Sequence, residues 1–300
     1  MKTNQTEINI KSLIKDFSIE TTPKVYSKYG QFGEFLHRKN HVYITYLPDE
    51  KSERVIDTAK KLNNEKFKAI PHLPARNFMD NSQLEKYIGS LSEIAGCEKI
   101  LVIGGPANQK GSIASSLDVL QTDLLSKYNF KEVGLAGHPE GSSDVPDEEL
   151  DKAIIEKNQF AKNADYKMYL ATQFFFDSSS FLVWEKHLET LNNCLDIHTG
   201  IPGPATLKTL VYYAASCGIG NSINFLSKQG MKISKIATTR TPDKLIADLA
   251  DYKNNNPSSK LCKLHFYAFG GIKKTSEWLN LISNSPLEIN SNNEFKPKSE

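Results

Sequence analysis

The chain has 300 residues, 39% of them hydrophobic, which is enough to bury a large core in one large domain or two small ones. The 37 Lys and Arg nearly balance the 35 Asp and Glu, and no long basic run occurs, which argues against a nucleic-acid-binding face. No stretch approaches the ~20 apolar residues of a membrane span, and residues 1–16 lack the apolar core of a signal peptide. The four cysteines form no C-x-x-C pair and indicate reduced thiols, so we expect a cytoplasmic protein.

Hydrophobic periodicity predicts short strands that alternate with helices along the chain. The expected strands are residues 17–21, 41–46, 67–70, 99–103, 133–136, 168–173, 196–200 and 264–267. The expected helices are residues 52–62, 81–95, 112–126, 146–163, 180–191, 205–216, 220–228, 242–252 and 273–282. Residues 1–16 are expected to be an N-terminal extension, and the polar residues 286–300 a disordered tail.

Eight strands that alternate with helices predict a parallel sheet, and this length favours a closed (β/α)8 TIM barrel over residues 17–285. An open doubly wound sheet is the competing architecture. Its dinucleotide fingerprint fails, because Gly218-Ile-Gly220 lacks the third glycine and follows a predicted helix. Gly105 to Gly111 has Lys110 in the wrong order for a phosphate-binding P-loop.

The predicted strand ends carry many functional side chains, and a barrel would gather them at one rim. The sixth strand is the most distinctive, because its apolar run ends in Thr172 and Gln173, before three phenylalanines that we interpret as core and Asp177. The strand ends supply Glu20, Thr45, His72, Arg76, Gly104, Gly105, His138, Glu140, Gln173, Asp177, residues 200–203 and Tyr267.

Two reaction classes lack their motifs. A metal hydrolase would need H-E-x-x-H or H-x-H, and only the H-x-E of His138-Pro-Glu140 is present. Acyl transfer would need a G-x-S-x-G elbow. The expected rim is rich in glycine, amide, imidazole and aromatic groups, which suits a flat heteroaromatic cofactor with phosphates.

Five motifs, taken together and in order, resemble the methylenetetrahydrofolate reductase family. They are ITY at residues 44–46, PHLPAR at 71–76, GHPEG at 137–141, ATQFFFD at 171–177 and HFY at 265–267. The resemblance runs from about residue 17 to residue 281. It implies a (β/α)8 barrel with bound FAD that takes electrons from NAD(P)H and reduces 5,10-methylenetetrahydrofolate to 5-methyltetrahydrofolate in one-carbon metabolism.

The resemblance also assigns roles to residues of this chain. Glu20, in IETTP, would be the general acid toward folate N10, with its pKa held near neutrality by partial desolvation. Gln173 and Tyr267 would contact the folate. The residues implied at the FAD site are Thr45, His72, Arg76, Gly104, Gly105, His138 and Lys157. No metal is implied, and a homo-oligomer is compatible with the resemblance.

Three departures from the family pattern leave an alternative open. Pro106 stands where an aspartate beside the flavin is expected, and Ser142-Ser143 replace His-Pro after GHPEG. PHLPAR and residues 200–210 suggest a divergent branch. The reaction could therefore run toward methyltetrahydrofolate oxidation. The alternative from another class is a folate-binding or accessory protein without flavin.

Overall fold

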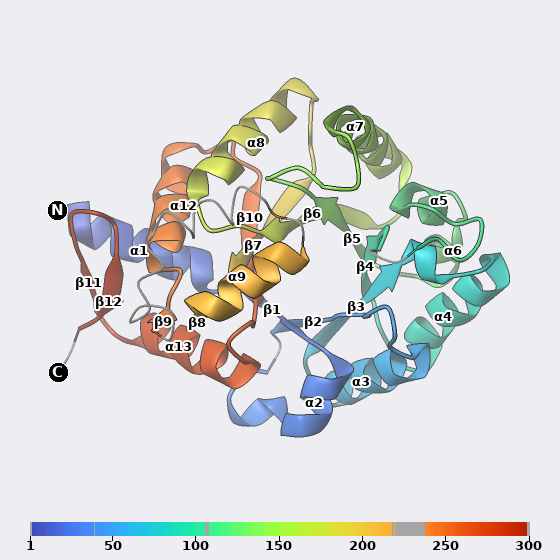
Figure 1. Cartoon of the computed structure of the whole chain (residues 1–300), viewed down its shortest axis with the longest axis horizontal. Coiled ribbons are helices and arrows are strands. Elements are labelled where there is room, and N and C mark those ends of the chain that lie inside the picture. Colours follow the sequence, from blue (N-terminus) through green and yellow to red (C-terminus); the bar gives the residue numbers. More distant parts are fainter. Residues whose placement is uncertain (1, 39, 106–107, 218, 220–237, 299–300) are drawn as a thin grey trace.

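The computed structural model describes residues 2–38, 40–105, 108–217, 219 and 238–298. Eight parallel strands close into a barrel in the order β1-β10-β7-β6-β5-β4-β3-β2, surrounded by helices (Figure 1). The predicted (β/α)8 fold is confirmed. The barrel strands are β1 (Ser18–Thr21), β2 (His41–Ile44), β3 (Lys68–Pro74), β4 (Lys99–Ile103), β5 (Glu132–Gly137), β6 (Lys167–Phe174), β7 (Asp196–Pro202) and β10 (Leu261–Tyr267).

The outer helices each bury one apolar stripe against the barrel. In α3 (Ser52–Asn64), for example, Val55, Ala59 and Leu62 are fully buried at spacings of four and three. The other helices are α1 (Lys2–Ile14), α2 (Pro23–Tyr29), α4 (Asn81–Glu93), α5 (Ser116–Leu120), α6 (Leu124–Lys127), α7 (Asp147–Asn163), α8 (Ser178–Thr190), α9 (Leu207–Ser216), α12 (Asp243–Asn255) and α13 (Ile272–Asn284). Within the described residues, no helix is both long and apolar enough to cross a membrane.

Large side chains fill the barrel interior. Tyr43 on β2 and Tyr169 on β6 meet with their hydroxyls 2.7 Å apart, and both are buried. The Tyr169 ring occupies the place of a side chain at Gly134 on β5, where a Cβ would lie 2.7 Å from the ring. The interior below the strand ends is therefore packed, so ligands have access only at the ends.

Two predicted elements differ from the structure. The helix predicted over residues 112–126 is two short helices, α5 and α6. A capping box between Ser115 and Asp118 starts α5 late, and Asp123 adopts a left-handed conformation that separates the two. The predicted exit loop at residues 71–76 is mostly strand, because β3 continues to Pro74. The helix predicted at residues 220–228 lies outside the described residues.

Both ends of the chain are structured and lie on the same side of the barrel (Figure 1). The prediction of a disordered tail is wrong for β11 (Leu287–Ile289) and β12 (Phe295–Pro297), which form an antiparallel hairpin. The tail is polar, but Leu287 and Phe295 enter the core and anchor it. At the other end, α1 packs on α12, α13, β10 and β11.

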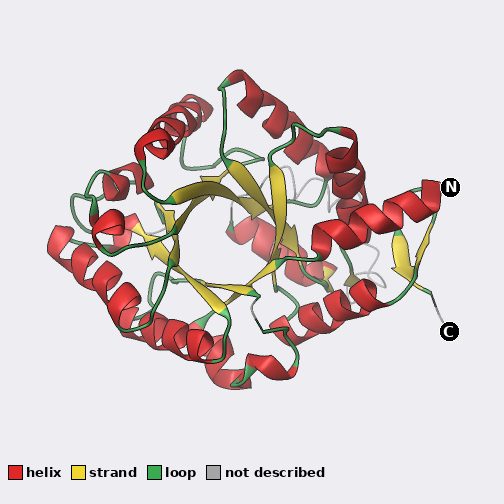
Figure 2. Cartoon of the chain, turned by 180° about the vertical axis from the view of Figure 1, so that it is seen from behind, coloured by secondary structure: helices red, strands yellow, loops and turns green. Residues whose placement is uncertain are grey.

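Helix α9 lies across the carboxyl end of the barrel, in front of it in Figure 1 and behind it in Figure 2. Its residues Leu207, Leu210 and Ala214 share an apolar cluster with Phe174 at the end of β6. The two-residue strands β8 (Ala205–Thr206) and β9 (Thr239–Arg240) pair antiparallel. This pairing joins the residues just before α9 to those shortly before α12.

Candidate functional site

Glu20 lies at the carboxyl end of the barrel, where the side chains of several strands meet. It is the third residue of β1, and its side chain is 14% exposed. One carboxylate oxygen accepts a hydrogen bond from the Thr45 hydroxyl, and the other lies 3.2 Å from Nε2 of His265 on β10. We call this end, lined by Glu20, Thr45, His72, His265 and Tyr267, the barrel mouth.

His265 is held in place on both sides of its ring. Its Nδ1 lies 3.0 Å from the buried hydroxyl of Ser18, and the Tyr43 ring packs 4.3 Å away, centroid to centroid. The imidazole is therefore oriented so that Nε2 meets the Glu20 carboxylate. The sequence pointed to His265 only as one letter of the HFY motif, and Ser18 carried no signal.

The Glu20 carboxyl is an anion at neutral pH. Burial raises its pKa, but the hydrogen bond from His265, the charges of His72 and His265, and the hydrogen bond from Thr45 together lower it below its ordinary value. The expectation that desolvation holds this pKa near neutrality is therefore wrong for the chain without ligand. Hydrogen bonding and charge outweigh burial here, and the group is better suited to accept hydrogen bonds than to donate a proton.

His72 on β3 offers a polar atom that the protein leaves unused. The side chain is buried, and its Nε2 has no hydrogen-bond partner among the described residues. Its backbone carbonyl accepts the Tyr87 hydroxyl at 2.9 Å, which fixes the strand at this point. A buried ring nitrogen without a partner is costly, so a ligand at the mouth that supplied one would be favoured.

Gln173 is positioned by an irregularity in the β6–β7 pairing. The register shifts between Ala171 and Phe174, and the Thr172 hydroxyl accepts the Gly200 amide at 2.8 Å. A Cβ on Gly200 would lie 2.6 Å from the Gln173 carbonyl, so the close approach requires glycine. The Gln173 amide donates to the Gly141 carbonyl at 3.0 Å, and its Oε1 has no partner among the described residues.

Aromatic rings form one wall of the mouth. Tyr267 stacks on Phe269 with ring centroids 5.6 Å apart, and Phe269 stacks on Tyr213 of α9 at 4.1 Å. The Tyr267 hydroxyl donates to the Thr172 carbonyl at 3.0 Å, which ties β10 to the end of β6. Sequence analysis missed Tyr213, because nothing in the pattern of α9 shows that it crosses the mouth.

The three phenylalanines after Gln173 have separate places. Phe174 and Phe175 are fully buried, as the interpretation as core requires. Phe176 is partly buried and lines a cavity of about 470 Å³ beside the mouth. Of the strand-end residues predicted from the sequence, Asp177, Pro202 and Gly203 line this cavity, whereas the residues that the resemblance assigns to folate or FAD do not.

Arg76, Gly104 and Gly105 are brought together, but the arginine is used within the protein. Its Nε donates to the Ala114 carbonyl at 3.0 Å and its Nη1 to the Gly105 carbonyl at 3.3 Å. Its backbone amide donates to the Gly104 carbonyl at 3.0 Å. Arg76 therefore clamps the loop after β4, and the second N–H of Nη1 and those of Nη2 are left for a ligand.

Lys157 and His138 lie close together beneath the loop after β5. Lys157 is 4% exposed, so it is not a solvated helix lysine, and its ammonium donates to the Ala136 carbonyl at 2.9 Å. Burial lowers its pKa to about 8. Burial and the charge of Lys157 lower the pKa of His138 to about 4. His138 is therefore neutral at pH 7.

Several histidines are neutral in the folded chain, which makes its stability depend on pH. Burial lowers the pKa of His41 to about 3 and that of His138 to about 4, whereas unfolded histidines titrate near pH 6.5. Below pH 6.5 the unfolded chain binds more protons, so the free energy of unfolding falls as the pH falls. Each of the two histidines should contribute a loss of ~2 kcal/mol between pH 7 and pH 5.

Urea denaturation at pH 7 and pH 5 measures this loss. His138→Gln should reduce the loss between the two pH values by ~2 kcal/mol relative to the wild type. An unchanged difference would show that His138 titrates normally in the folded chain.

Among the described residues, no three His, Cys, Asp or Glu side chains are placed to share a metal ion. The arrangement that the mouth does present is an anchored carboxylate, an unpartnered imidazole nitrogen, an amide oxygen and a wall of aromatic rings. Such groups can hold a flat, polar heteroaromatic molecule edge-on through hydrogen bonds and face-on through stacking.

Comparison with known proteins finds a structure of similar fold but no matching family. No family model matches the sequence. A structure from Aquifex aeolicus VF5 is 12% identical over 82% of this chain and 96% of that chain, with a TM-score of 0.38, too low to carry an argument. An uncharacterized protein from Clostridium thermocellum, which binds two copies of 5-methyl-5,6,7,8-tetrahydrofolic acid, is 13% identical over 94% of this chain and 98% of that chain, with a TM-score of 0.57. At this identity, the likeness shows that the two chains share a fold.

Proposed function

We propose that the barrel mouth binds a reduced folate and that Glu20 is the anchor for its pterin ring. The Glu20 carboxylate, oriented at the mouth by Thr45 and His265, is the observation that carries this proposal. One edge of a pterin presents a ring N–H and an amino group, and a carboxylate accepts hydrogen bonds from such a pair. Both oxygens of Glu20 keep lone pairs beyond those used by Thr45 and His265.

The surroundings of Glu20 support a flat ligand. His72 Nε2 and Gln173 Oε1 are polar atoms without partners among the described residues, and Tyr267 and Phe269 offer ring faces. The Clostridium thermocellum protein of the same fold binds a methylated tetrahydrofolate. The resemblance to methylenetetrahydrofolate reductase also implies that Glu20 and Gln173 act on the folate.

FAD-dependent interconversion of methylenetetrahydrofolate and methyltetrahydrofolate with NAD(P)H is the second candidate. The position of Glu20 at the mouth favours it, and bound FAD would supply the hydride. The cations that the resemblance assigns to FAD do not fit its diphosphate, however. The Lys157 ammonium is buried against the Ala136 carbonyl, and Arg76 is committed to two carbonyls. Folate binding without a required flavin is therefore the function that the geometry supports best.

Calorimetric titration of the purified chain with 5-methyltetrahydrofolate tests the proposal. We expect saturable binding in the absence of FAD. p-Aminobenzoylglutamate, which lacks the pterin, should not bind measurably, because it cannot reach the Glu20 anchor. A chain that binds no folate with or without FAD would overturn the proposal. Flavin absorbance that appears on adding FAD and bleaches under anaerobic NADH, with folate binding only then, would establish the second candidate instead.

A further inference from the structure

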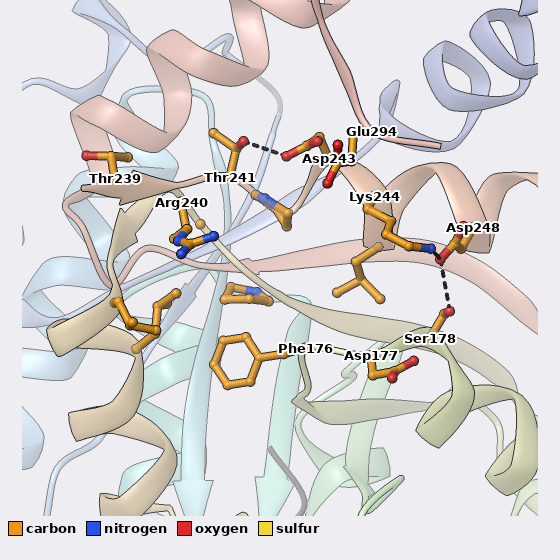
Figure 3. A pocket seen from close by; sticks show the side chains of 16 residues that line it. Phe176, Asp177, Ser178, Thr239, Arg240, Thr241, Asp243, Lys244, Asp248 and Glu294 are labelled. Atoms are coloured by element: carbon orange, nitrogen blue, oxygen red, sulfur yellow. Dashed lines mark hydrogen bonds and ion pairs between the residues drawn. The ribbon is translucent and has the colours of Figure 1, made fainter. Parts of the chain in front are cut away.

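The cavity beside the mouth is formed by four segments that are distant in sequence. Phe176 and Ser178 lie where β6 leads into α8, and a second segment runs from Pro202, at the end of β7, into α9. The third segment runs from β9 into the start of α12, and Glu294, between β11 and β12, is the fourth (Figure 3). Its volume of about 470 Å³ is within the range of small-molecule sites. The walls combine apolar side chains with six charged ones, so the cavity can bind a ligand that has both apolar and charged parts.

Arg240 is the charged side chain of the cavity that has no hydrogen-bond or ion-pair partner among the described residues. Its backbone is fixed because β9 pairs with β8, Arg240 opposite Ala205. Its Nε is buried without a hydrogen bond, and its guanidinium makes no ion pair with any described residue. In Figure 3 the guanidinium points into the space between the lining side chains. A buried donor without an acceptor is costly, and a carboxylate is the acceptor that matches a guanidinium best.

The other charges make a simple anion a poor ligand. Lys244 is paired with Asp248 at 2.6 Å, which cancels one charge of each sign. Three carboxylates then remain against the single charge of Arg240, namely Asp177, Asp243 and Glu294. A ligand with only negative charge would meet net repulsion, whereas a zwitterion can place its carboxylate on Arg240 and its ammonium near the acidic side chains.

The apolar part of the wall specifies the rest of the ligand. Phe176, Leu207, Leu210 and Leu245 line the cavity together with the charged groups. We infer that this cavity binds a free α-amino acid with an apolar side chain. The carboxylate lies on Arg240, the ammonium toward Asp243 and Glu294, which lie together in Figure 3, and the side chain against the leucines. The inference is independent of folate binding, because no residue of the mouth is used.

Three matched ligands test the inference on the full-length chain by calorimetry. L-Leucine carries both charges, 4-methylpentanoate lacks the ammonium, and 3-methylbutylamine lacks the carboxylate. We expect saturable binding of L-leucine and at least ~10-fold weaker binding of each analogue, because each loses one charged contact. Equal binding of 4-methylpentanoate and L-leucine would contradict the inference, as would no binding of L-leucine at 10 mM, about the weakest affinity such a titration detects.

Variants locate the site. Arg240→Gln should weaken L-leucine binding at least ~10-fold, whereas Arg54→Gln, at an exposed ion pair on α3, should leave it unchanged. Glu294→Gln is a second variant, because the negative charge is lost while the amide oxygen can still accept the hydrogen bond from Asn290. It should weaken L-leucine binding and leave 4-methylpentanoate binding no weaker. Unaltered L-leucine binding in both Arg240→Gln and Glu294→Gln would place the ligand elsewhere and overturn the inference.

Discussion

Replacing Glu20 by Gln should weaken the binding of 5-methyltetrahydrofolate at least ~30-fold, which corresponds to ~2 kcal/mol. The amide keeps one acceptor oxygen but loses the negative charge, and its amino group faces the donors of the pterin edge. Calorimetric titration of the variant against the wild type measures the change. Binding within about twofold of the wild type would show that Glu20 is not the anchor.

The matched control is Glu53→Gln. Glu53 is exposed in the first turn of α3, on the outside of the barrel, and is not one of the residues that line the mouth, so its replacement should leave folate affinity unchanged. Thermal unfolding of both variants separates a binding defect from a folding defect. If the chain proves to be a flavin reductase, Glu20→Gln should slow the folate half-reaction and spare the reduction of the flavin by NADH. Equal loss of both half-reactions would point to a structural role.

Replacing Glu185 by Ala should lower the free energy of unfolding by ~3–5 kcal/mol, roughly a 10 °C drop in Tm. Glu185 on α8 is 2% exposed. Its carboxylate accepts hydrogen bonds from the Ser259 hydroxyl at 2.9 Å and from the amides of Lys260 at 2.6 Å and Leu261 at 3.2 Å. Alanine would leave these donors without their acceptor at the point where the chain enters β10.

Glu189→Ala, one turn further along α8 on its exposed face, is the control and should change stability by less than ~0.5 kcal/mol. Glu185→Gln should fall between the two, since its one oxygen can still accept from the backbone amides. Urea denaturation of the three variants gives the comparison. If Glu185→Ala lowers the free energy of unfolding no more than Glu189→Ala does, the buried carboxylate does not stabilise the chain at the start of β10.

The strands could be predicted because each is a short apolar run closed by polar residues, and the alternation with helices then specifies a barrel. Glu20 and Gln173 could be placed at one rim for the same reason, since parallel strands end together. The state of Glu20 could not be predicted. It depends on His265 of β10, which meets Glu20 and Ser18 of β1 only when the barrel closes. The position of α9 and the anchoring of Leu287 likewise depend on contacts that no local pattern contains.

The hydrogen bonds of Arg76 and Lys157 show a second limit of sequence analysis. A basic residue at a strand end predicts a bound anion equally well whether its partner is a ligand or a backbone carbonyl. Only the geometry distinguishes these cases, and here both side chains donate to carbonyls within the chain. The assignment of both residues to FAD stays a prediction, and the motifs that carry it do not indicate what these side chains already bind.

The packing of α1 against the last third of the chain has a consequence for biosynthesis. The surfaces that cover Ile10, Leu13 and Ile14 include α12, α13 and β10, which leave the ribosome long after α1 does. The Asp251 carboxylate, which accepts a hydrogen bond from the Asn9 side-chain amide at 3.3 Å, is also part of that late segment. While the chain is being made, the apolar face of α1 therefore stays uncovered, and β1 lacks one of its two neighbours. The first element to emerge is among the last to dock, so nascent chains are most exposed to aggregation, and most dependent on chaperones, until α12, β10 and α13 have emerged and the barrel closes.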